Sequence, residues 1–89
     1  MGSLYSEEIS KIIRLPQWPK GFIFEIREDP YQLNFVVFRD NFERFNGEDK
    51  LYISGLVGQT INKIRKIGIP CYLQVEKGDG RGNSVAENR

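Results

Sequence analysis

The sequence predicts an α+β fold: one small domain with element order αββαβ, whose helices pack on one face of a three-stranded sheet. Two segments, residues 6–15 and 46–67, repeat apolar residues at the spacing of a helix. Residues 22–28 alternate apolar and charged side chains as a half-buried strand does. With 89 residues the chain has enough length for one core. We expect a single domain over residues 1–77 and a flexible Gly-rich tail over residues 78–89.

The first helix is predicted over residues 6–15. Ser6 is an N-cap residue, and the two glutamates that follow it put negative charge at the positive end of the helix dipole. Three isoleucines then share one face: Ile9, Ile12 and Ile13. Pro16 ends the helix, because proline disfavours helical geometry in the residue before it.

A β-hairpin follows the connector. Phe22, Phe24 and Ile26 share one face of the first strand, and Asp29-Pro30 has the composition of a tight turn. The returning strand, residues 32–38, is apolar on both faces over its second half. A strand that is apolar on both sides is typical of the centre of a sheet, or of a strand that helices cover on one side and a partner covers on the other.

The longest apolar stripe predicts a long helix. Asn46 is its expected N-cap, Asp49 stands at the capping-box position, and Gly68 is the expected C-terminal stop. Before it, residues 39–47 could form a helical turn, with Phe42 and Phe45 along one side together with the preceding Phe38. The stripe itself consists of Leu51, Ile53, Leu56, Val57, Ile61, Ile64 and Ile67.

The third strand is predicted over residues 71–77, with Cys71, Leu73 and Val75 pointing inward. Cys71 is the only cysteine, which excludes an internal disulfide and a cysteine-based zinc site. A lone thiol in an apolar run is typical of a small buried hydrophobe. A reducing cytoplasm suits it best, and this would be the host cytoplasm if the protein is viral.

The composition also argues against several function classes. The net charge of +1 gives no overall field toward nucleic acid or anionic lipid, and no apolar run reaches the ~20 residues of a membrane span. The chain has no histidine, so histidine-based catalysis and ligation are absent. Four acidic residues between positions 40 and 49 fit no calcium-loop spacing. We therefore expect neither an enzyme, nor a metal site, nor a cofactor.

The aromatic residues outnumber what one sheet face needs. Surplus apolar surface on a small domain is typical of an interface, so we expect a non-enzymatic module that acts by protein–protein contact or self-association, as in a homodimer. Its size and the absence of catalytic groups resemble those of small phage accessory or host-modulating proteins. For the tryptophan, which lies between two prolines, the sequence favours packing over the core, and an exposed contact residue is the other interpretation. The candidate contact residues are Trp18, Tyr31, Phe38, Phe42, Phe45 and Tyr52.

Gly55 and Gly58 allow two interpretations. The sequence Ile53-x-Gly55-x-x-Gly58-x-x-Ile61-x-x-Ile64, followed by Gly68 and an apolar strand, resembles the type II KH domain. That resemblance implies a Gly-x-x-Gly loop that clamps single-stranded nucleic acid. The residues between the glycines, Leu56 and Val57, instead favour one continuous core helix whose glycines let it approach the sheet closely. The nucleic-acid alternative has the candidate residues Gly55, Gly58, Asn62, Lys63 and Lys66.

Overall fold

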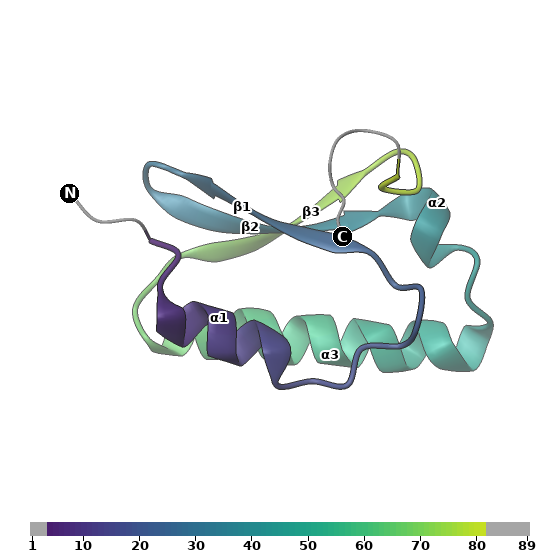
Figure 1. Ribbon diagram of the computed structural model, residues 1–89, viewed down its shortest axis with the longest axis horizontal. Coiled ribbons are helices and arrows are strands. Elements are labelled where there is room, and N and C mark those ends of the chain that lie inside the picture. The colour runs from purple at the N-terminus through teal and green to yellow at the C-terminus, as the bar shows by residue number, and fades with distance from the viewer. Residues whose placement is uncertain (1–3, 82–89) are drawn as a thin grey trace.

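The computed structural model describes residues 4–81 and has the predicted α+β architecture (Figure 1). A short helix, α2, is added to the predicted αββαβ order. The elements are α1 (Glu7–Arg14), β1 (Phe24–Asp29), β2 (Gln32–Phe38), α2 (Arg39–Phe42), α3 (Gly47–Lys66) and β3 (Cys71–Glu76).

The three strands form one mixed sheet in the order β1-β2-β3. β1 pairs with β2 antiparallel, and β2 pairs with β3 parallel. The parallel pair requires a crossover, which α3 provides. Helices α1 and α3 both lie beneath one face of the sheet (Figure 1). The fold class and the central position of β2 were therefore predicted correctly.

Local signals decide where the helices begin. The Ser6 hydroxyl accepts a hydrogen bond from the Ile9 amide at 3.3 Å, and the Asn46 side chain accepts one from the Asp49 amide at 2.8 Å. Both residues have extended backbones, as N-caps require. Gly68 follows α3 with φ +91° and donates its amide to the Arg65 carbonyl, so it ends the helix as predicted.

The core lies between helices α1 and α3 and the sheet. Alternate residues of β2, Leu33, Phe35 and Val37, face the helices and are at most 7% exposed. Buried isoleucines and a valine of α3 pack against them, together with Ile9 and Ile13 of α1. Trp18 covers one side of this core: its ring lies 4.8 Å from that of Phe24, and its Nε1 donates to the Ile13 carbonyl at 2.9 Å.

Polar groups cross the other face of the sheet. Arg27 of β1 reaches over β2 to make a bidentate contact with Glu76 of β3, and it also binds Glu25 at 2.9 Å. Val36 lies between these strands on that face and is fully buried. The hydrogen bond from Arg27 holds the pKa of Glu76 below its usual range, and the same contact raises the pKa of Arg27.

Residues 78–81, the first part of the predicted tail, contact the domain. The Gly78 carbonyl accepts the Asp40 amide at 2.9 Å, and Asp79 lies 3.4 Å from Arg44. Gly80 packs so closely on Phe38 and Ile23 that a Cβ there would lie 2.7 Å from the Phe38 ring. The contacts of the domain therefore continue past the predicted boundary at residue 77. The remainder of the predicted tail lies outside the described residues.

Asn41 is a buried polar residue that the sequence patterns did not single out. Its side chain accepts the Ile23 amide and donates to the Gly21 carbonyl, both at 2.9 Å. These bonds fasten the connector before β1 to α2. Within residues 4–81 no helix is both long and apolar enough to cross a membrane.

Candidate functional site

Strand β3 differs from its predicted environment. Cys71 is fully buried, but Leu73 is 54% exposed and Val75 is 58% exposed, although both were predicted to point inward. They do lie on the helix side of the sheet, in register with Phe35 and Val37. β3 is an edge strand, and the two helices do not cover its second half. The prediction of burial was therefore wrong for two of the three side chains.

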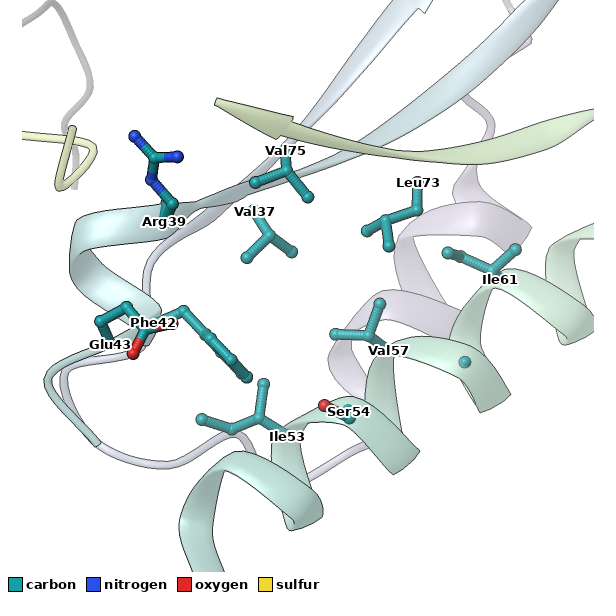
Figure 2. A pocket seen from close by; sticks show the side chains of 11 residues that line it. Val37, Arg39, Phe42, Glu43, Ile53, Ser54, Val57, Ile61, Leu73 and Val75 are labelled. Carbon is teal, nitrogen blue, oxygen red and sulfur yellow. The ribbon is translucent and has the colours of Figure 1, made fainter. Parts of the chain in front are cut away.

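An apolar groove of about 460 Å³ opens beneath this part of β3. Figure 2 shows Leu73 and Val75 above it and Val57 and Ile61 of α3 below it. A groove of this volume is in the range of protein ligand sites. Its other lining residues are Val37, Arg39, Phe42, Glu43, Ile53, Ser54 and Gly58.

On the groove side of α3, Gly58 leaves one position without a side chain between the bulkier Val57 and Ile61. α3 is one continuous helix through Gly55 and Gly58, so the structure has a helix where the KH-like alternative has a loop. A Cβ at either glycine would have no neighbour within 4 Å. The prediction that these glycines let α3 approach the sheet was therefore wrong, because the space beside them is open. Gly58 lines the groove instead.

The outer edge of β3 has unpaired backbone groups. The Leu33 amide donates to the Pro70 carbonyl at 2.9 Å, so the even-numbered residues that continue β3 direct their amides and carbonyls toward β2. The odd-numbered residues therefore direct theirs outward. The outward carbonyl of Cys71 is occupied, since it accepts a 2.8 Å hydrogen bond from Arg65 Nε. No strand in the described part of the chain pairs with the outward groups of Leu73 and Val75.

The two edges of the sheet differ in charge. In β1 four of the six residues are charged, whereas in β3 only Glu76 is. Charged side chains protect edge strands against pairing with other chains. Apart from Glu76 at its end, β3 has no such charge, and it has no proline. It is therefore the edge at which a further strand can be added.

Of the six aromatic candidates, the structure brings only Phe42 to the groove. Trp18 and Phe45 pack against the core, and Phe38 is 3% exposed on the opposite sheet face. Tyr31 is 83% exposed in the β1–β2 turn, and Tyr52 is 49% exposed with its hydroxyl donating to the Gln17 carbonyl. The aromatic candidates do not form one surface.

The residues that do form one surface are mostly aliphatic or small. Leu73 and Val75 border the groove together with Ser54 and Gly58, and Leu51, which is 77% exposed, lies one turn before Ser54 on α3. Sequence reasoning missed this role because it assigned the strand residues to the core. The absence of charge in residues 71–75 was the signal that could have indicated it.

The nucleic-acid candidates lie along the exposed side of α3. Asn62, Lys63 and Lys66 are exposed, together with the two glycines. Arg65, the remaining cation of this segment, is engaged with the start of β3: its Cζ lies 5.3 Å from the centre of the Tyr72 ring.

The described residues contain no group of three side chains that could hold a metal ion. Burial raises the pKa of the Cys71 thiol, which keeps it in the protonated, weakly nucleophilic form.

No protein-family model, no curated protein and no solved structure matched this chain. The groove and the open edge of β3 are thus defined by the geometry of this chain alone.

Proposed function

We propose that this domain is a non-enzymatic protein-binding module. It binds an extended segment of a protein chain along the outer edge of β3. The segment pairs its backbone with the free groups of Leu73 and Val75, and it places apolar side chains over the groove. Adding a strand to an open sheet edge is a recurring mode of peptide recognition.

One observation carries this proposal: the unpaired backbone groups and the uncovered apolar side chains belong to the same two residues, Leu73 and Val75. Backbone pairing supplies affinity for any extended chain, and the groove adds selectivity for apolar residues at every second position. The polar rim formed by Arg39 and Glu43 fits the usual anatomy of an interface, which has an apolar centre and a polar border.

Selection from a random peptide library tests the proposal. The domain is immobilised sparsely, so that its copies do not meet, and the enriched peptides are measured by titration calorimetry. We expect peptides with apolar residues at alternate positions. Val75→Lys should weaken them about tenfold or more, because it places a charge at the mouth of the groove. The control is Tyr31→Ser, which changes an exposed residue in the distant β1–β2 turn and should have no effect.

Hydrogen exchange provides the second readout. The amides of Leu73 and Val75 should become protected when peptide is bound, because strand addition uses them directly. Enriched peptides that bind Val75→Lys as well as the unchanged domain, without protecting these amides, would assign recognition to another surface.

A further inference from the structure

We infer that the segment bound at the edge of β3 is β3 of a second copy of this chain, so that the protein is a two-fold symmetric dimer. This inference rests on the proposed function and names its partner. The required segment is extended, almost uncharged and apolar at alternate positions. β3 itself, with the sequence Cys-Tyr-Leu-Gln-Val-Glu, meets that description.

The free groups select one register. Two copies of a strand that pair about a two-fold axis run antiparallel, and directly opposed residues must lie on the same face. An axis through Gln74 places Leu73 opposite Val75 of the second copy, and Val75 opposite its Leu73. Both residues direct their backbones outward, so each pair exchanges two hydrogen bonds. This register uses the free groups at Leu73 and Val75 in both copies and leaves the Arg65–Cys71 contact intact.

The side chains suit this register. The exposed Leu73 and Val75 of the two copies form one apolar patch on the helix side. On the other face Gln74 meets its own copy, and a glutamine amide can both donate to and accept from another. No like charges are opposed along the paired segment. An axis through Val75 instead would set Leu73 against Lys77, which opposes an apolar residue to a charge.

Helix α3, which lies beneath the sheet, also allows the second copy to approach in this register. From Cys71 to Gln74 the strand advances three residues, or about 10 Å. A helix advances by the same distance in about seven residues. Counting back from Arg65, which contacts Cys71, places Gly58 beneath Gln74. The two α3 helices therefore run antiparallel and pass each other at Gly58. Helix axes pack about 8–10 Å apart, and the open space beside Gly58 permits this.

The charges along α3 are complementary in this arrangement. Its first turn contains Glu48 and Asp49, and its last turn contains Lys63, Arg65 and Lys66. Antiparallel pairing brings the acidic start of each helix toward the basic end of the other. With a net charge of only +1 per chain, overall repulsion between the copies is small.

Sedimentation analysis and light scattering from about 1 µM to about 1 mM test the inference, since this range spans moderately tight to weak association. We expect a species with twice the 10.3 kDa mass of one chain. Gly58→Lys should make the protein monomeric, because two lysines would meet at the axis. The domain should still fold, since the position is open and lysine favours helix more than glycine does. Gln59→Lys adds the same charge at the next, exposed position and should leave the dimer intact.

A cysteine at the axis tests the register. In Gln74→Cys the two Cα atoms of a non-hydrogen-bonded pair lie about 4.5 Å apart, within the range of a disulfide. Mild oxidation should link the two chains, whereas the unchanged protein should stay unlinked because Cys71 is buried.

The outcomes separate this inference from the proposed function. A chain that stays monomeric up to about 1 mM but binds peptides through Val75 would overturn self-association and leave the peptide-binding role standing. A dimer that persists in Gly58→Lys, or one in which Gln74→Cys forms no cross-link, would also overturn the inference. A monomer that binds no peptide at β3 would overturn both.

Discussion

Arg65 Nε donates a 2.8 Å hydrogen bond to the carbonyl oxygen of Cys71, and this contact fixes where the open edge of β3 begins. The same guanidinium lies over the ring of Tyr72. A residue near the end of α3 thus occupies the first outward carbonyl of the strand and leaves the next ones accessible.

Arg65→Ala should destabilise the domain by about 1–2 kcal/mol, because it removes a charge-assisted hydrogen bond from a partly buried carbonyl. Urea unfolding at low protein concentration measures the change. Lys66→Ala is the matched control, since its side chain is exposed on the same turn. Equal effects of the two substitutions would show that the Cys71 contact contributes nothing to stability.

Gly55→Ala should stabilise the domain by about 1 kcal/mol, because a glycine inside a helix costs about that much and a Cβ there meets no neighbour. For a domain of this size the melting temperature should rise by about 4–8 °C. Gly68→Ala should instead destabilise the domain, since φ +91° strains any residue with a Cβ. A loss of stability in Gly55→Ala would contradict the open space seen beside α3.

The stability of the domain should depend on pH through Glu76. Its pKa is lowered chiefly by the hydrogen bond from Arg27, so the folded state favours the ionised carboxylate. The stabilisation is fully present above the ordinary carboxyl pKa of about 4.3 and is lost as the pH falls through the lowered value. Glu76→Gln should therefore destabilise the protein at neutral pH and much less in strong acid.

Thermal unfolding across this pH range provides the measurement for Glu76. Arg27→Gln and the double variant complete a mutant cycle, in which the two effects at neutral pH should be less than additive. If Glu76→Gln destabilises the protein by the same amount at neutral and at acidic pH, the ion pair with Arg27 is not the cause of the destabilisation.

Single-stranded oligonucleotides should not bind saturably at micromolar protein and physiological salt. Lys63 and Lys66 on the exposed side of α3 supply about two phosphate contacts, and the continuous helix offers no loop at Gly55 and Gly58. Fluorescence anisotropy is the measurement. Binding that disappears when Lys63 and Lys66 are changed to glutamate would favour the KH-like function instead.

Much of the fold could be read from the sequence because local chemistry specifies it. The caps at Ser6, Asn46 and Gly68 set three helix ends through bonds to nearby backbone groups. The turn at Asp29 is equally local, since its carboxylate accepts the amides of Tyr31 and Gln32.

The candidate site could not be read in the same way. An apolar residue at every second position shows which face of a strand a side chain occupies, but not whether another element covers that face. Leu73 and Val75 have the pattern of core residues. The six aromatic candidates are divided among the core, the opposite sheet face, the groove and the solvent-exposed surface, which their positions in the sequence do not show.

The sequence by itself determined the elements of this protein, their order, the helix caps and the central position of β2, because these follow from periodicity and from contacts a few residues apart. Only the tertiary structure decided that β3 lies at an edge, that α1 and α3 leave its second half uncovered, and that Gly55 and Gly58 face open space. The physical reason is that burial depends on which elements meet in space, and two helices cover only part of one face of a three-stranded sheet.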